Sequence, residues 1–337
     1  MRKLASVQKI LSVDPHPNAD TLDIATIEGW HCIVKKGDFN AGDLCIFFEV
    51  DSVLPDTNPV FAFLEKYHYR IRTQKLRGFI SQGLCMPVSL IPDELVEEGS
   101  DVTDVLGVTK YEPPIHESLR GLVKGNFPAF MHKTDEIRVQ NIQGVLNRYK
   151  GENFTISEKL DGMSFTCYLH DNEFGICSRN MDLKPDENNS MWKTARSYDY
   201  ESILRHYYEM HGVELAFQGE IIGYNIAKNP YKLPSGEHRI YLFNIFDITN
   251  QKYWSNVEVL KFCLENCILM VPIIDMEFQL ITDIDALSDM ADGKSMINHD
   301  VRREGLVFRP IKEMYDYEIG RLSFKSVSKE YLLKHDS

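Results

Sequence analysis

The chain has 337 residues with 43% hydrophobic and 26% charged residues, values of a globular protein with about two domains. It contains no apolar run of about eighteen residues and no signal-peptide core, so neither a transmembrane helix nor a membrane partner is expected. The net charge of -13 argues mildly against nucleic-acid binding, and seven scattered cysteines without a C-x-x-C pair predict an intracellular, reducing compartment such as the cytoplasm.

Residues 1–108 consist of short apolar segments separated by turn-forming residues. The expected strands are 22–27, 31–35, 44–50 and 83–87. Short strands with frequent turns over about a hundred residues predict a small β-barrel or sandwich.

A cationic cluster lies within this first region, interleaved with aromatic side chains. It consists of Lys66, Arg70, Arg72, Lys75 and Arg77. Alternating cations and rings are typical of surfaces that bind single-stranded nucleic acid. A solvated strand face with some buried tyrosines explains the pattern equally well, and both interpretations remain open.

Residues 109–135 are rich in proline and glycine with little periodicity, and we expect a linker there. The second domain is placed at 136–337, beginning with helical spacing over 136–149. Further helices are expected at 200–210, 256–266 and 284–291, and strands at 164–170, 173–178, 214–222, 239–249, 305–309 and 322–327. Strands outnumber helices, which predicts an α+β domain with antiparallel sheets.

The motif Glu158-Lys159-Leu160-Asp161-Gly162 joins two of the predicted strands. A lysine held there, with a carboxylate two residues on and a glycine that permits close backbone approach, is placed to attack a phosphate. An ordinary surface lysine before a turn is the simpler interpretation of so short a pattern.

Five later motifs follow this lysine in a distinctive order. They contribute Arg179 in S-R-N, Glu220 in Q-G-E, Phe246 in I-F-D, Glu304 in E-G-L-V and Lys325 in F-K-S. In this order and spacing, residues from about 130 to 333 resemble the covalent nucleotidyltransferases, which include ATP-dependent ligases and mRNA capping enzymes.

Within that superfamily the chain most resembles the RNA ligases of the Deinococcus and Naegleria type. The stretch Lys133-Thr134-Asp135-Glu136, followed by Arg138, precedes the lysine motif as it does in those ligases. These relatives also carry an N-terminal oligonucleotide-binding (OB) barrel. The resemblance therefore implies an OB-like nucleic-acid-binding domain at 1–108 and a nucleotidyltransferase domain at 136–337.

The resemblance also implies residue roles. Lys159 would attack the α-phosphate of ATP to form lysyl-AMP, Lys325 would hold that phosphate, and Phe246 would stack on adenine unless it is a core aromatic. The other implied nucleotide-binding residues are Glu158, Leu160, Arg138, Arg179, Glu220 and Glu304. Water-mediated ligands for Mg²⁺ or Mn²⁺ would be Asp161, Glu220 and Glu304, because hard oxygen ligands suit these ions.

The predicted function is an ATP-dependent RNA ligase that joins 3′-OH and 5′-phosphate ends. Its expected substrates are RNA or RNA/DNA duplex ends, namely nicks with RNA on the 3′-OH side, and no obligate protein partner is expected. Two alternatives stay open: a GTP-using capping-type enzyme, and a non-catalytic RNA-binding protein with a degenerate nucleotide site. The last motif departs from many relatives in having one lysine, Lys325, with the next only at Lys329.

Overall fold

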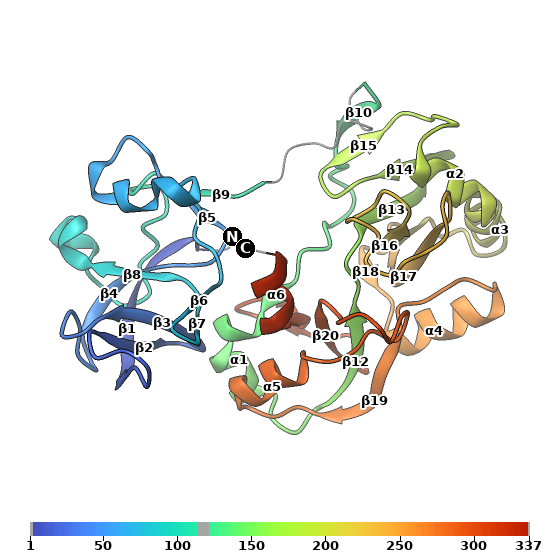
Figure 1. Ribbon diagram of the computed structural model, residues 1–337. Helices are drawn as coiled ribbons and strands as arrows, with labels where there is room; N and C mark the ends of the chain where they lie inside the picture. Colours follow the sequence, from blue (N-terminus) through green and yellow to red (C-terminus); the bar gives the residue numbers. More distant parts are fainter. Residues whose placement is uncertain (1–2, 113–120, 336–337) are drawn as a thin grey trace. The chain divides into compact units, whose positions relative to one another are not determined.

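The computed structural model describes residues 3–112 and 121–335, which divide into two compact units (Figure 1). The first unit contains the described residues up to 112, together with Gln140–Gln143 and the chain from Lys329 onward. The second contains the remainder, up to Ser328. No helix in these described ranges combines the length and apolar character needed to span a membrane.

An antiparallel five-stranded sheet in the order β3-β2-β1-β4-β8 forms the centre of the first unit. Its strands are β1 (Ala5–Pro15), β2 (Leu22–Ile27), β3 (Trp30–Lys35), β4 (Leu44–Phe48) and β8 (Leu84–Pro87). Alternation along β4 sends Ile46 and Phe48 into one apolar core and Cys45 and Phe47 into another. The register shift between Ile10 and Ser12 in β1 is a bulge of the kind that lets a sheet curl. The strands predicted for a small barrel are all present.

Short elements complete the first unit. They are β5 (Ser52–Val53), η1 (Pro59–Tyr67), β6 (Gln74–Leu76), β7 (Phe79–Ser81), η2 (Val88–Leu90), η3 (Asp93–Leu95) and β9 (Thr109–Lys110), with η5 (Val139–Asn141) and α6 (Lys329–His335) from later in the chain. The Trp30 indole donates to Asn141 over 2.6 Å, and the Asn141 amide donates to Glu49 over 2.7 Å. Residues 140–143 are therefore bound into this unit although they follow it by more than a hundred positions in the sequence.

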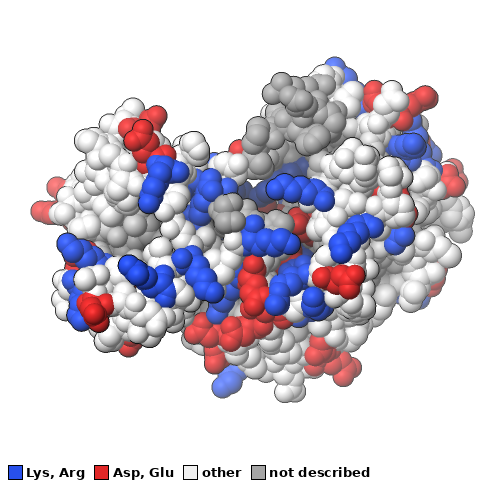
Figure 2. Space-filling model, viewed as in Figure 1, with Lys and Arg blue, Asp and Glu red and all other residues white. Residues whose placement is uncertain are grey.

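The cationic cluster of the first unit is partly structural. Arg70 pairs with Asp51 over 2.6 Å and stacks on Tyr111, with 3.9 Å from guanidinium to ring centroid. Tyr67 and Tyr69 pack against the apolar core, as the second interpretation predicted. The cations that remain exposed are Lys66, Lys75 and Arg77, and Figure 2 shows separate Lys and Arg side chains over the visible face of this unit.

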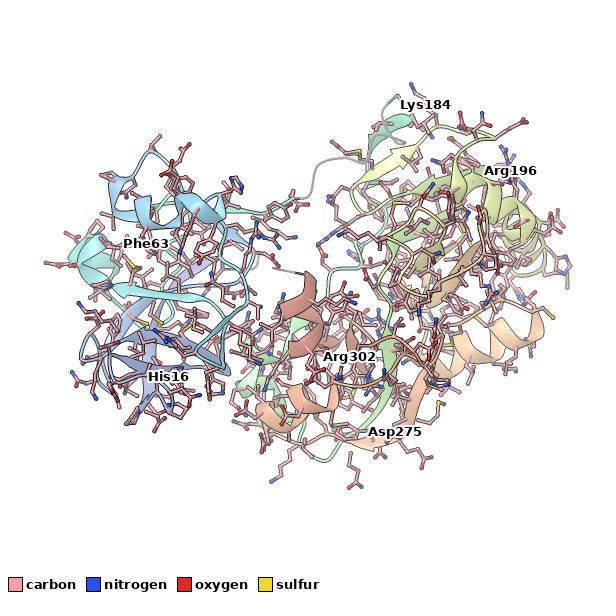
Figure 3. All side chains as sticks on the ribbon, viewed as in Figure 1. His16, Phe63, Lys184, Arg196, Asp275 and Arg302 are labelled. Atoms are coloured by element: carbon pink, nitrogen blue, oxygen red, sulfur yellow. The ribbon has the colours of Figure 1, made fainter. Side chains whose placement is uncertain are left out.

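The second unit contains two antiparallel-rich sheets. The larger has the order β10-β15-β14-β13-β16-β17-β18 and the smaller β11-β23-β20-β12-β19. The strands of the larger sheet are β10 (Val123–Asn126), β13 (Met163–His170), β14 (Glu173–Cys177), β15 (Met181–Leu183), β16 (Leu215–Gly223), β17 (His238–Asp247) and β18 (Lys252–Tyr253). Those of the smaller are β11 (Ile137–Arg138), β12 (Asn153–Lys159), β19 (Ile273–Gln279), β20 (Gly305–Pro310) and β23 (Phe324–Val327), with the hairpin β21 (Tyr315–Asp316) and β22 (Gly320–Arg321) nearby. In Figure 3, Asp275 marks the edge strand β19.

The helices of this unit are α1 (Gln143–Arg148), α2 (Ser190–Ser197), α3 (Tyr200–His211), α4 (Asn256–Glu265) and α5 (Ile284–Met290). Apolar side chains of α2, α3 and α4 pack on one face of the larger sheet, where Phe217 and Ile221 of β16 are buried. Because side chains alternate along β16, Gln218 and Glu220 point to the opposite face. That face carries these polar side chains together with buried apolar ones such as Ala216 and Ile222.

Two sequence predictions fail at the boundary between the units. Much of the expected linker 109–135 is integrated: β9 pairs with β5, β10 pairs with β15, and Met131 joins an apolar cluster with Tyr168. Residues 113–120 lie outside the described ranges. The helix expected over 136–149 exists only as α1, because Ile137 pairs instead with Phe324 in β23. In both places tertiary pairing overrides a weak local signal.

Candidate active site

The central lysine lies at the end of a strand in the middle of the smaller sheet. Lys159 is the last residue of β12 and pairs with Gly305 of β20, which lies beside it in Figure 1. Glu304 immediately precedes β20, and the Lys159 Nζ donates to its Oε2 over 2.6 Å. The loop that leads to Glu304 contains Arg302, which is labelled in Figure 3. Two motifs separated by 145 positions are thus joined by a single ion pair.

Neighbouring strands bring two further cations to the same place. Lys325 of β23 pairs with Val307 of β20, and Arg138 of β11 pairs with Lys325 in parallel register. Burial and the positive charges of Lys159 and Arg138 lower the pKa of Lys325 to about 7. The smaller sheet therefore concentrates positive charge where the resemblance places the α-phosphate.

Two further carboxylates come from the larger sheet and from the turn that leads into it. Glu220 of β16 pairs with Ser164 of β13, and the chain reaches β13 through Asp161. Burial would lower the pKa of Lys159, but the carboxylates of Glu304, Glu220 and Asp161 outweigh it and raise this pKa. Burial, with help from Glu304 and Asp161, raises the pKa of Glu220 to about 8 in spite of Lys159. Three acidic groups and a lysine therefore share one partly buried space, where each controls the charge of the others.

These oxygen donors also suit a metal ion. Asp161, Glu220 and Glu304 offer only hard carboxylate ligands, which are the preferred ligands of Mg²⁺ and Mn²⁺. The raised pKa of Glu220 fits the same conclusion, since an added cation would relieve the repulsion among the three groups.

The arginine of the S-R-N motif lies at the edge of this site. Arg179 pairs with Asp135 over 2.6 Å, and Asp135 in turn acts electrostatically on Lys325. Lys133 donates to Asn180 over 2.9 Å. The segment 133–135, which resembles the stretch before the lysine motif of RNA ligases, thus contacts the S-R-N turn.

Glu158 and Leu160 flank the lysine but face elsewhere. The Glu158 carboxylate is buried, accepts a hydrogen bond from the Met296 amide over 2.8 Å, and burial raises its pKa. Leu160 is buried in an apolar cluster with Ile222 and Tyr231. Side chains alternate along β12, so the Glu158 side chain points away from that of Lys159. In this arrangement only the backbone of Glu158 could contact a nucleotide bound at Lys159.

Phe246 is not exposed toward the lysine. Its ring is fully buried and lies edge-on to His132 and 4.9 Å from the centroid of Tyr253. Stacking on a base requires an open ring face, so the structure favours the core-aromatic interpretation. Phe243, three residues earlier, is partly exposed and packs against the cluster that contains Leu160. A register shift opposite Gln218 and Gly219 lets Phe243 reach that side of the sheet.

A buried polar network beneath Phe243 was missed by the motif search. Arg309 donates to Glu136 over 2.8 Å, to the Ser323 hydroxyl over 3.1 Å and to the Phe243 carbonyl over 3.1 Å. Arg321 donates to Asn244 over 2.9 Å and forms a two-bond pair with a neighbouring glutamate. This network ties the two sheets together. Its sequence signal was weak, since Arg309 merely ends E-G-L-V-F-R.

Comparison with known proteins agrees with this geometry. Residues 152–327 match the family described as RNA ligase, and residues 4–88 match an OB-fold domain. The chain belongs to the RNA ligase family. No curated protein gave a significant match.

Solved structures of the Naegleria gruberi RNA ligase are similar along the whole chain. An apo variant has 36% identity and a TM-score of 0.89 and covers 100% of both chains. A variant with ATP and Mn has 36% identity and a TM-score of 0.89, covering 99% of this chain and 100% of its own. A third, with AMP and Mn, has 37% identity and a TM-score of 0.88, covering 99% of both. The protein is therefore an RNA ligase with an N-terminal OB-fold domain and a covalent nucleotidyltransferase domain.

Proposed function

We propose that this RNA ligase uses ATP and carries AMP on Lys159. The amine forms a P–N bond to the α-phosphate while the bond to pyrophosphate breaks. AMP then passes to an RNA 5′-phosphate, which frees the lysine and forms a 5′-5′ pyrophosphate. A 3′-OH attacks that end, forms the phosphodiester and expels AMP. The observation that carries the proposal is the contact of Lys159 with Glu304 beside Glu220, Asp161 and Lys325.

In the ion pair with Glu304, Lys159 is not ready to act as a nucleophile. With its pKa raised, Lys159 is an ammonium ion at neutral pH and has no lone pair for attack. If Glu304 helped to hold a divalent cation, Lys159 would lose its closest counter-charge. The nearby positive charge of Lys325 would then disfavour the ammonium form and make the free amine accessible.

The metal ion would be held through its water shell by Asp161, Glu220 and Glu304. When bound, it supplies positive charge that neutralises the phosphates and the leaving pyrophosphate. Arg138 and the protonated form of Lys325 add positive charge for the α-phosphate. Arg179 at the edge of the site is placed for AMP or the substrate phosphate. The ATP and Mn complexes of the Naegleria enzyme support this choice of nucleotide and ion.

For the adenine we propose that Phe243 provides the stacking ring that the sequence assigned to Phe246. Phe243 is partly exposed next to Leu160, whereas Phe246 is covered on all sides. Aromatic stacking requires the exposed ring face that only Phe243 offers. Arg309 holds the Phe243 backbone carbonyl, so the ring has a fixed support.

The preferred substrate we infer is a 3′-OH/5′-phosphate nick in a duplex with RNA on the 3′-OH side. The resemblance to the Naegleria type of ligase supports this preference. The OB-fold unit, with exposed Lys66, Lys75 and Arg77, offers cations for a phosphate backbone.

The deciding experiment is incubation with α-labelled ATP and either Mg²⁺ or Mn²⁺, followed by denaturing electrophoresis. Wild type should retain covalent label and Lys159→Ala should retain none. Equal label on both proteins refutes the proposal. The same incubation with labelled GTP separates a capping-type enzyme, which would be labelled by GTP, and the absence of all labelling would indicate a non-catalytic binding protein.

A further inference from the structure

The turn that follows Lys159 has a backbone amide that no strand can satisfy. β12 ends at Lys159 and β13 begins at Met163, so Leu160–Gly162 lie outside both ladders. The Asp161 N–H instead donates to the Tyr231 hydroxyl oxygen over 2.7 Å. A buried N–H without an acceptor is unfavourable, so the Tyr231 hydroxyl stabilises the turn by accepting this hydrogen bond.

The other side of the same turn is tightly packed. A Cβ on Gly162 would lie 2.4 Å from the Ile221 carbonyl oxygen and 2.9 Å from Glu220 Cγ. The backbone of Gly162 also hydrogen-bonds the Glu220 carboxylate. The turn is thus held between β16 on one side and Tyr231 on the other, which leaves its backbone little freedom.

Tyr231 comes from a segment whose backbone is itself unusual. The connection between β16 and β17 holds five non-glycine residues at positive φ: Asn225, Ala227, Lys228, Asn229 and Lys232. Such conformations are unfavourable for residues with a Cβ and persist only where surrounding contacts impose them. They are most frequent at sites where the exact placement of a group matters.

Specific contacts impose this conformation around Tyr231. The Asn229 side chain accepts from the Leu233 amide over 3.0 Å and donates to its carbonyl over 2.8 Å, which closes a loop around the tyrosine. Asn298 donates to the Tyr231 carbonyl over 3.0 Å. The ring is buried with Leu160 in the apolar cluster. The hydroxyl is therefore fixed from its backbone, its ring and its hydrogen bond.

We propose that Tyr231 is a positioning residue for adenylylation: by accepting the Asp161 amide hydrogen bond it fixes the end of β12, and so sets the direction from which the Lys159 amine approaches the α-phosphate. This rests on the proposed role of Lys159. It assigns the β16–β17 connection a part in the first chemical step. The third step, attack by a 3′-OH on an AMP-capped end, does not use the lysine as nucleophile and depends less on this bond.

The test compares two steps in the same variant. Tyr231→Phe keeps the ring and removes the acceptor; at saturating ATP it should slow formation of labelled enzyme about tenfold, equal to about 1.4 kcal/mol. Its sealing of a preformed AMP-capped RNA should fall less than threefold, and its KM for ATP should change less than twofold. Tyr200→Phe is the matched control, because Tyr200 is equally buried in the same unit and its hydroxyl has no partner among the described residues.

Asn298→Ala gives a second test that leaves the tyrosine in place. It loosens the Tyr231 carbonyl and should cause a smaller fall, again confined to adenylylation. Adenylylation by Tyr231→Phe at the wild-type rate overturns the proposal. So does an equal loss of both steps, or an equal loss in Tyr200→Phe, since these indicate a merely structural role. Failure of the Lys159 proposal is recognised separately, by the labelling of wild type and Lys159→Ala.

Discussion

The buried ion pair between Glu136 and Arg309 makes a quantitative prediction about the stability of the catalytic unit. The Arg309 side chain is 4% exposed and that of Glu136 15%, with 2.8 Å between them. Glu136→Gln preserves the size but removes the charge, and leaves a buried guanidinium without its counter-ion. Removing one partner of a buried ion pair lowers the free energy of unfolding by about 3–5 kcal/mol. Because glutamine can still accept one hydrogen bond, we expect a loss of about 3 kcal/mol for Glu136→Gln.

The pH dependence of the loss of stability in Glu136→Gln shows whether the missing charge causes it. Burial would raise the pKa of Glu136, but Arg309 and Arg321 outweigh it and hold this pKa below its ordinary value. A depressed pKa in the folded state stabilises the protein above the unfolded value of about 4.3, and this contribution disappears as the pH falls through the folded value. Wild type and Glu136→Gln should therefore differ most near pH 7 and converge below about pH 4.

Urea denaturation at pH 7, at about pH 4 and at about pH 3, followed by the fluorescence of the tryptophans, measures both effects. Glu265→Gln is a suitable control, because its pair with Lys261 is open to solvent and should contribute less than about 1 kcal/mol. A loss below about 1 kcal/mol at pH 7 for Glu136→Gln, or a loss that does not vary with pH, would contradict the reasoning.

Three further predictions follow from the site and the OB-fold unit. Phe243→Ala should raise the KM for ATP about tenfold while the melting temperature stays nearly unchanged. Phe246→Ala should instead lower the free energy of unfolding by about 3–5 kcal/mol. A raised KM in Phe246→Ala and a loss of stability in Phe243→Ala would return the stacking role to Phe246. The raised pKa of Lys159 means that kcat/KM for adenylylation should increase with pH as the free amine becomes available, and because the pKa of Lys325 is about 7 this increase should level off above pH 7. Lys325→Arg should let the increase continue to higher pH; an unchanged profile would show that the charge at 325 is not required. Replacing the exposed cations of the OB-fold unit together by alanine should weaken nick sealing severalfold, and more steeply with added salt, but should leave adenylylation unchanged. Lys261→Ala is the control and should change neither step. A loss of adenylylation in the triple variant would contradict a role limited to substrate binding. These cations are Lys66, Lys75 and Arg77.

Substitution is preferable to deletion for testing the OB-fold unit. Asn141 is hydrogen-bonded to Trp30 and Glu49, and Gln140–Gln143 belong to the first unit although the sequence places them after the linker. A truncation near residue 110 would expose this segment and remove its partners. The loss of sealing in such a truncated protein would not report on substrate binding alone.

The sequence was sufficient wherever a short-range pattern carries the information. Short apolar stretches bounded by turn-forming residues located β16 and β17. The helix expected at 200–210 is α3, which Gly212 ends in the left-handed conformation that glycine adopts readily. The ordered motifs also identified the family, because their order and spacing along the chain are typical of it.

Only the tertiary structure decided which side chains actually meet. A register shift of one residue in β17 brings Phe243 to the face of the larger sheet that carries Glu220, and no local pattern reveals that shift. Tyr231 reaches Asp161 across 70 positions of sequence. The sequence by itself named the lysine and the acidic residues of this ligase, whereas their charge states, their spacing and the support beneath them depend on burial and on contacts between distant strands, which only the folded chain brings into existence.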